Sequence, residues 1–534
     1  MERYGFFAMP LLSSFMSLIL NFVKNTNPLM YFLTMNRFLS VIFVTILVPF
    51  ALSAQIGELP RSSPEEQGVS SAKVMAFLDS ITSLSSTEIH GVVLMRHGHI
   101  IAEKYSRPFA AEYGHTLFSC SKTFTSAAIG IAIAENRLRL DDRLAAFFPE
   151  YLPDTIDGRL ASITIRDLLT MTSGFRPTNY VRNNETQWIR TYLANEIVAE
   201  PGKRFAYDSM GTYLLSAIIQ RVTGQTLLDY LRPRLFEPLH IEHLNWEWSP
   251  EGVTCGGWAL YMQAESMAKF GLLLLNKGEW NGRQLIPSRW VEAMMYPHVK
   301  RDDGDAYCYQ MWECPHPNTA RADGAFGQYI IVMPDENAVL VVTQCQHGDA
   351  PQREMQWLFE MLVPTFSDEP LIIGKDTQRL ADKDYSLPYA EGKAKTKSIR
   401  EINGKRYMLG ENRLGWKSVM VDQTGKALSL IVETTDGMQN SIRCGYHSWC
   451  YSKVDVNFAP HPWVETKGTY SGFTEPFTTG SSYGWVKNDE LRICTHFVDW
   501  MSGLDITLCF DFKQPYIEVK ENFKEQSWRA VMTP

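Results

Sequence analysis

The chain has 534 residues, which is too long for one ordinary domain, so we expect two folded domains and a targeting segment. Its apolar content of 45% and charged content of 21% are typical of a soluble globular protein. The net charge is −8, and no basic cluster is placed to follow a phosphate backbone, which argues against nucleic-acid binding.

The N-terminus is apolar and indicates export. Residues 6–23 are nearly all apolar, and a second apolar run, 38–52, follows a short basic segment that starts at Met35. The second run has the layout of a secretory signal, with cleavage after Ser53 or Ala54, and Met35 would then be the true start. The mature protein would be periplasmic or secreted. The alternative is a transmembrane helix over 6–23, and we expect membrane attachment only through such an uncleaved segment.

Between residues 55 and 370 the pattern predicts a mixed helix and strand domain. Two apolar runs around a Gly-containing turn, at 92–95 and 100–102, indicate a hairpin. A buried helix is expected over 127–135. The remaining predicted elements of this domain are a mainly helical region at 160–290, a strand pair at 328–333 and 338–343, and a helix at 352–362.

Beyond residue 370 the composition and the hydrophobic pattern of the sequence change. A polar, charged stretch at 371–398 is predicted to be a linker. Residues 399–534 are rich in alternating strands, for instance 491–497 and 504–512, and are predicted to form a small antiparallel β domain, either a barrel or a sandwich.

Nine cysteines are spread along the chain without metal-ligand spacing such as C-x-x-C. An exported protein could form disulfides, and Cys308/Cys314 and Cys444/Cys450 are the close pairs. Buried free thiols explain the same cysteines equally well.

Ser119 is the candidate nucleophile because of its position. The Ser-x-x-Lys spacing occurs three times, and the pairs Ser70–Lys73 and Ser266–Lys269 have the pattern of surface positions on amphipathic helices. Ser119 instead precedes a buried helix, and residues three apart on a helix share a face, so Lys122 is expected beside its hydroxyl. Burial and the helix N-terminus both disfavour a charged lysine there. Taken alone, Ser119 is better explained as a helix N-cap, which is a common role for serine.

Many segments resemble the serine β-lactamase-like hydrolases, which include class C β-lactamases, D-peptidases, esterases and 6-aminohexanoate-dimer hydrolases. The resemblance covers roughly residues 58–365, in family order. The matching segments are Pro64–Gly68, Phe118–Lys122, Leu168–Gly174, Pro201–Gly202, Phe205–Tyr207, Thr223–Gly224, Gly256–Leu260, Met267–Gly271, Trp280–Gly282 and Gly327–Tyr329. It implies an α+β fold, in which helices flank an antiparallel sheet beside an all-helical subdomain, with the small all-β domain following.

The resemblance also implies the rest of the catalytic machinery. Tyr207 matches the tyrosine of the family's Tyr-x-Asn motif and would share a proton with Lys122, while Ser209 replaces the asparagine. The backbone N–H groups of Ser119 and Gln328 would form the oxyanion hole.

The family's third motif, Lys-Thr-Gly or His-x-Gly on a strand facing the serine, matches Ala325–Gly327. Ala325 carries no cation, whereas in the β-lactam-binding members of the family that cation helps to hold a substrate carboxylate. Its absence weakens the case for a β-lactamase or a D-alanyl carboxypeptidase. Large aromatics could line a pocket or belong to the core. The residues expected to bind substrate are Ser209, Phe326, Gly327, Tyr180, Trp188 and Trp258.

The sequence therefore predicts an exported serine hydrolase that forms an acyl-enzyme on a small ester, amide or D-peptide, without a metal or organic cofactor. One alternative is a penicillin-recognising-type binding or sensing protein that has lost turnover. Another is a β-lactamase or D-alanyl carboxypeptidase. A third makes the β domain the functional binder, for instance of a glycan.

Overall fold

The computed structural model describes residues 57–178, 186–301, 304–346, 352–461, 470–511, 513–524 and 527–534. The predicted signal segment and Tyr180 lie outside these residues. Residues 59–534 form one unit by their internal contacts. Within the described ranges, no helix is both long and apolar enough to cross a bilayer.

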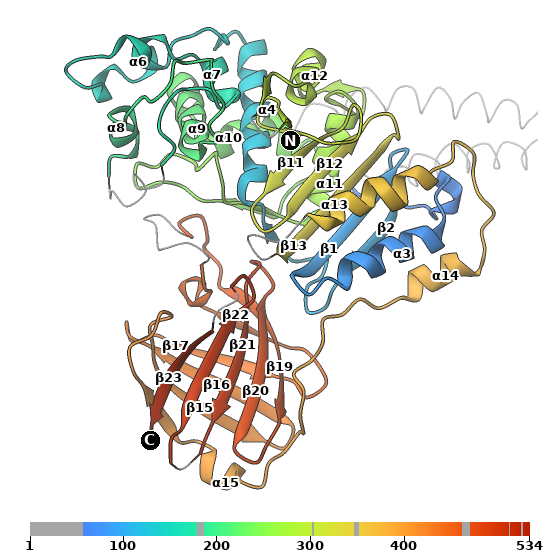
Figure 1. The fold of residues 1–534 in the computed structure, drawn as a ribbon, viewed down its shortest axis with the longest axis vertical. Helices are drawn as coiled ribbons and strands as arrows, with labels where there is room; N and C mark the ends of the chain where they lie inside the picture. Colours follow the sequence, from blue (N-terminus) through green and yellow to red (C-terminus); the bar gives the residue numbers. More distant parts are fainter. Residues whose placement is uncertain are drawn as a thin grey trace, which may run out of the picture. The chain divides into compact units, whose positions relative to one another are not determined.

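An eight-stranded antiparallel sheet organises the first part of the chain (Figure 1). Its strands, in spatial order, are β2 (His99–Tyr105), β1 (Thr87–Arg96), β13 (Ala338–Gln346), β12 (Gln328–Met333), β11 (Ala320–Gly324), β10 (Trp312–Glu313), β9 (Ala306–Tyr307) and β8 (Val299–Lys300). Both predicted strand pairs are confirmed, because 92–95 and 100–102 fall in β1 and β2 and 328–333 and 338–343 fall in β12 and β13.

Helices cover both faces of this sheet, which explains why its central strands are apolar on both sides. Val93 and Met95 of β1 belong to the core on the face of α11 (Ala264–Leu275). Val92 and Leu94 belong to the core on the opposite face. The helices of that opposite face are α3 (Ser71–Thr82), α13 (Arg353–Trp357) and a π-helical turn (Leu358–Leu362).

A helical subdomain lies between β2 and β8 in the chain, as predicted. Its helices are α4 (Ser121–Ala134), α5 (Leu144–Phe147), α6 (Gly158–Ser162), α7 (Ile165–Leu169), α8 (Trp188–Leu193), α9 (Ser209–Thr223) and α10 (Leu227–Leu231). The helix α12 (Ser288–Met295) follows α11 and packs against α4. The first twelve residues of α4 are buried, so this helix is the centre of the fold and a rigid base for whatever its N-terminus carries.

The C-terminal part is a ten-stranded antiparallel sheet within the described residues (Figure 1). Its strands are β17 (Gln439–Cys444), β16 (Ala427–Thr434), β15 (Trp416–Thr424), β14 (Arg406–Leu409), β23 (Ser527–Thr533), β22 (Tyr516–Glu521), β21 (Gly503–Cys509), β20 (Glu490–Phe497), β19 (Phe477–Trp485) and β18 (Cys450–Val454). Gly445, just after β17, donates to Ser481 O at 3.0 Å and accepts from Tyr483 N at 2.9 Å. These bonds join the β17 end of the sheet to β19, the strand next to the other end, so the predicted β domain closes into a barrel and is not a sandwich.

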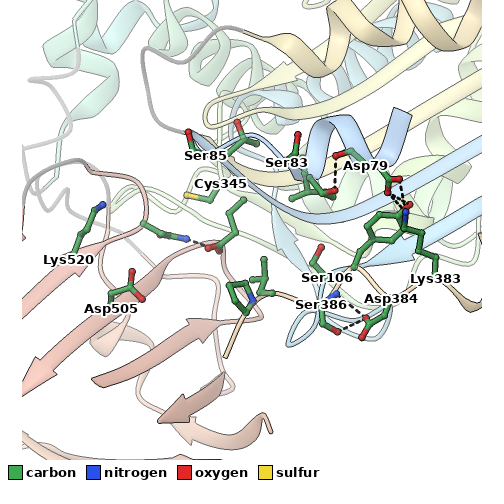
Figure 2. A pocket seen from close by; sticks show the side chains of 18 residues that line it. Asp79, Ser83, Ser85, Ser106, Cys345, Lys383, Asp384, Ser386, Asp505 and Lys520 are labelled. Carbon is green, nitrogen blue, oxygen red and sulfur yellow. Dashed lines mark hydrogen bonds and ion pairs between the residues drawn. The ribbon is translucent and has the colours of Figure 1, made fainter. Parts of the chain in front are cut away.

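The predicted linker is more ordered than its polar composition suggests. It contains α14 (Lys375–Asp382), which packs on α3 through the buried Leu380. Lys383 then donates to Asp79 Oδ2 at 2.6 Å. This connection borders a pocket of about 690 Å³ that is lined by α3, β1 and the barrel strands β21 and β22 (Figure 2).

All nine cysteines lie in described residues and are free thiols. The close pairs Cys308/Cys314 and Cys444/Cys450 are therefore not disulfides here, and the alternative of free, mostly buried thiols holds.

Candidate active site

Ser119 lies in a short 3₁₀ turn, Phe118–Cys120, directly before α4. Strand β3 (His115–Thr116) leads into this turn and pairs with β5 (Leu260–Met262), which in turn pairs with β4 (Leu244–Trp246). Leu117 N donates to Leu260 O at 2.8 Å, and Ser121 Oγ donates to Phe118 O at 2.6 Å. Leu260 N donates back to Ser121 Oγ at 3.0 Å. The turn is thus fastened on both sides of the serine.

Lys122 lies beside Ser119, as the helical spacing predicts. Its Nζ is 3.0 Å from Ser119 Oγ, 3.0 Å from Ser209 Oγ and 2.6 Å from Gly257 O. The lysine is only 1% exposed, and these three partners are two hydroxyl groups and a backbone carbonyl. A buried amine held between two hydroxyls and a carbonyl can exchange a proton with the serine.

The other two Ser-x-x-Lys pairs occupy different environments. Ser70 is the N-cap residue of α3, and Lys73 is exposed. Ser266 and Lys269 are buried in α11, which corrects the expectation of a surface pair. Lys269 Nζ donates to His240 O at 3.2 Å.

Tyr207 stacks against Trp312, with ring centroids 5.4 Å apart, and Lys122 Nζ lies 4.8 Å from the centre of its ring. Burial raises the pKa of Tyr207, and a hydrogen bond with Ser119 works in the opposite direction without cancelling it. The phenol is therefore protonated near neutral pH, which suits a proton donor better than the proton-sharing partner of Lys122 that the resemblance implied.

Asp208 and Ser209 begin α9. Asp208 caps this helix by accepting from Met210 N at 3.0 Å, and it also accepts from Tyr192 Oη. Burial raises the pKa of Asp208 to about 7. Ser209 Oγ accepts a hydrogen bond from Lys122 Nζ, and Ser209 is not among the residues that line the pocket.

Strand β11 faces the turn that carries Ser119, and Gly324 is the residue of this strand that lies close against the turn. A Cβ added to Gly324 would lie 2.3 Å from Leu117 O, closer than any side chain tolerates. The predicted motif at Ala325–Gly327 is therefore misplaced, because those residues form the turn after the strand. Phe326 and Gly327 have positive φ values of 62° and 87° in this turn.

The predicted oxyanion donor Gln328 is also corrected. It is fully buried at the start of β12, pairs with Gly324, and its side chain donates to Gln344 O at 2.7 Å. Ala325, not Gln328, lines the pocket beside Ser119. The backbone N–H of Ala325 is therefore the better partner for that of Ser119.

Gly324→Ala is expected to slow the reaction of Ser119 with a fluorophosphonate about 10-fold or more, because a methyl group would push β11 away from the turn that holds Ser119. Gly158→Ala is the matched control, since a Cβ there meets no atom within 4 Å. The labelling rate and the thermal unfolding of both variants provide the check. A wild-type labelling rate in a folded Gly324→Ala variant would contradict the close approach.

A pocket of about 470 Å³ opens above Ser119. It is lined by Ser119, Tyr207, Arg301, Asp305, Trp312, Arg321, Asp323, Ala325 and Gln352. Six of these were not predicted from the sequence: Arg301, Asp305, Trp312, Arg321, Asp323 and Gln352. The alternation of β11 places Arg321 and Asp323 on one face, and that is the signal that could have identified them.

Two of the charged side chains in this pocket, Arg321 and Asp323, form an ion pair. Arg321 Nε donates to Asp323 Oδ2 at 2.8 Å, and Arg321 also donates to Glu313 O at 2.8 Å. Burial raises the pKa of Asp323, although Arg321 acts against it. Arg301 lies over the ring of Trp312, with its guanidinium carbon 4.6 Å from the ring centre. Cations thus reach the pocket from positions other than Ala325.

Two predicted substrate-binding aromatics belong to the core. Trp188 is fully buried and its ring centroid lies 6.1 Å from that of Trp258, and both rings pack near Tyr213. Neither lines the pocket above Ser119. Among the described residues, no group of three or more His, Cys, Asp or Glu side chains could hold a metal ion.

A family model described as Beta-lactamase matches residues 80–363, which is more than half of the chain. The chain belongs to the beta-lactamase family. The matched residues contain Ser119, Lys122, Tyr207 and every lining residue of the pocket. Membership of this family supports a serine hydrolase in general.

Individual relatives match more distantly. Protein flp of Staphylococcus aureus (strain COL) is 31% identical over 141 residues, which are 25% of this chain and 28% of that protein. The chain thus spans little more than a quarter of this curated relative. An uncharacterized protein from Alkalihalophilus pseudofirmus is 21% identical over 294 residues, covering 47% of this chain and 82% of that protein.

Two solved structures also resemble this chain at low sequence identity. The octameric penicillin-binding protein homologue from Pyrococcus abyssi has a TM-score of 0.47 and 16% identity, covering 86% of this chain and 99% of its own. A family VIII carboxylesterase has a TM-score of 0.48 and 13% identity, covering 57% of this chain and 99% of its own.

Proposed function

We propose that the protein is a serine hydrolase that cleaves a small polar ester or amide through an acyl-enzyme on Ser119. The observation that carries this proposal is the 3.0 Å contact between the buried Lys122 Nζ and Ser119 Oγ, at the base of a pocket. A serine that merely capped α4 would need neither the buried lysine nor the open pocket.

The cycle starts with uncharged Lys122, which takes the proton of Ser119 as Oγ bonds to the substrate carbonyl carbon. The negative charge that develops on the carbonyl oxygen is held by the N–H groups of Ser119 and Ala325. The leaving group departs with a proton from Tyr207, which recovers one from Lys122. Water then gives a proton to Lys122 and attacks the acyl carbon, and Ser119 leaves with its proton restored.

The pocket lining favours a polar or charged substrate over a long alkyl chain. Arg301, Asp305, Arg321 and Asp323 all contribute to its wall, and a hydrocarbon placed there would remove their solvation without replacing it. Trp312 and Tyr207 give the same pocket an aromatic surface, on which a flat or methylene segment can pack. Short acyl groups with a polar end fit both features.

The test is a serine-reactive fluorophosphonate probe followed by peptide mapping, together with a panel of p-nitrophenyl esters and anilides and a chromogenic cephalosporin. We expect an adduct on Ser119 and turnover of short polar acyl groups ahead of octanoate. Labelling of Ser119 without turnover of any compound would favour a binding or sensing protein. Turnover of the cephalosporin alone would favour a β-lactamase, and no adduct on Ser119 would refute the proposal.

We also propose that the protein acts outside the cytoplasm, after removal of the segment that ends near Ser53. The support is the sequence pattern alone: a basic start, an apolar run and small residues before the cleavage point. N-terminal sequencing of the protein recovered from the periplasm or medium should begin at Ala54 or Gln55. An intact N-terminus on cytoplasmic protein would contradict export.

A further inference from the structure

Two turns of the active site hold aromatic residues in a backbone conformation that such side chains rarely adopt. Phe118, directly before Ser119, has a φ of 43°, and Phe326, directly after Ala325, has a φ of 62°. Non-glycine residues at positive φ cost free energy and persist only where their surroundings hold them. These two residues flank the two backbone N–H groups assigned to the oxyanion hole. Side chains that fix the rings of Phe118 and Phe326 therefore also fix the positions of these two N–H groups.

The two rings contact each other, with centroids 5.4 Å apart. The next layer comes from the C-terminal barrel. Trp500 lies 5.6 Å from Phe118, and Phe523 lies 6.1 Å from Phe326, measured between ring centroids. Each strained aromatic is thus supported by a different aromatic residue of the barrel, 382 positions later in the chain for Phe118 and 197 positions later for Phe326.

Trp500 also supports the strand beside the nucleophile turn. It stacks on Tyr261 of β5, with centroids 5.2 Å apart and planes 23° apart. The neighbouring residue Leu260 accepts the hydrogen bond of Leu117 N and donates to Ser121. One tryptophan therefore touches both the turn and the strand that fastens it.

Hydrogen bonds anchor Trp500 and the turn that carries Phe523. Trp500 is 2% exposed, and its indole N–H donates to Pro460 O at 3.3 Å. The turn that carries Phe523 is anchored by Asn522, whose Nδ2 donates to Glu88 Oε1 of β1 at 3.1 Å. The same Glu88 oxygen lies 3.2 Å from Nδ1 of His496 on β20. A buried polar contact thus fixes the barrel to the sheet close to the aromatic contacts.

We propose that the C-terminal barrel is a structural part of the active site, and that Trp500 and Phe523 are positioning residues for the hydrolysis. They press Phe118 and Phe326 into their strained conformations and so keep the N–H groups of Ser119 and Ala325 aimed at the developing oxyanion. The inference rests on the proposed function, and it gives the barrel a role other than separate ligand binding.

The test compares Trp500→Leu with Trp416→Leu in the full chain. Trp416 is equally buried, but its ring neighbours Phe458 and Trp528 both belong to the C-terminal part. We expect both variants to lose thermal stability, and only Trp500→Leu to lower kcat and the rate of fluorophosphonate labelling, roughly 10- to 100-fold, with KM within about 3-fold of wild type. Trp500→Phe should restore most of kcat.

A folded Trp500→Leu variant with wild-type kcat and labelling rate would overturn the inference. Equal kcat losses in the two leucine variants would also overturn it, because they would show a general effect of barrel stability. If Trp500→Leu does not fold, Phe523→Leu decides under the same criteria. The proposed function fails separately, through activity that survives in Ser119→Ala, whatever the barrel variants do.

Discussion

Ser119→Ala is expected to lower kcat by ~10⁴-fold or more and to abolish fluorophosphonate labelling, with the fold unchanged. The reason is that the hydroxyl is the atom that forms the acyl bond, so no other group in the cycle replaces it. The side chain is small and lies in a turn whose fastening bonds come from Leu117, Phe118 and Ser121. Its removal should therefore leave thermal unfolding within a degree or two of wild type.

Ser209→Ala is the matched control for this prediction. Both hydroxyls lie 3.0 Å from Lys122 Nζ, but only Ser119 lines the pocket. We expect Ser209→Ala to keep the labelled adduct and to lose only about 10-fold in kcat, as one oriented hydrogen bond to the lysine is removed. Comparable activity in Ser119→Ala and Ser209→Ala would show that the nucleophile is misassigned.

The catalytic pair and the sheet follow from local sequence rules. Ser119 and Lys122 are three residues apart, and the short 3₁₀ turn that runs into α4 brings their side chains together as a helical spacing does. Strands β1 and β13 are apolar on both faces, so the central sheet is visible in the sequence as continuous apolar runs. Both the serine–lysine spacing and the apolar runs are set by residues that are close together in the sequence, so they can be predicted from it.

The facing strand could not be located in this way. The triplets Ala322–Gly324 and Ala325–Gly327 both spell Ala-x-Gly, and sequence alone gives no reason to prefer the first. The choice is made by a tertiary contact, the close approach of Gly324 to Leu117 O. The same limit applies to Trp188, since a buried core aromatic and a pocket aromatic have the same local pattern.

The barrel shows a further limit of sequence patterns. The alternation in residues 490–509 identifies strands but not what the barrel touches, because Trp500 sits in the connection between β20 and β21. Its partners Phe118 and Tyr261 lie hundreds of residues earlier, in the other domain. The positive φ of Phe118 is likewise absent from any pattern, since phenylalanine has no preference for it.

Lys122→Met should be the second most damaging substitution, with kcat about 10³- to 10⁴-fold below wild type and KM little changed. Methionine has a similar length and tolerates a buried site, but it cannot take the proton of Ser119. The acyl-enzyme would then form slowly, so a stopped-flow burst of p-nitrophenol should disappear. The fluorophosphonate should still reach Ser119, at a rate reduced in parallel with kcat.

Lys269→Met separates this chemical loss from the cost of removing a buried amine. Lys269 is also buried in a Ser-x-x-Lys motif, and its Nζ donates to His240 O much as Lys122 donates to Gly257 O. Each substitution deprives a carbonyl of a donor, which costs about 1–3 kcal/mol of unfolding free energy where the carbonyl is buried. Because the two variants share that cost, only Lys122→Met should lose the burst. A normal burst in Lys122→Met, or an equal loss in Lys269→Met, would mean that the lysine beside Ser119 acts on the fold and not on the proton.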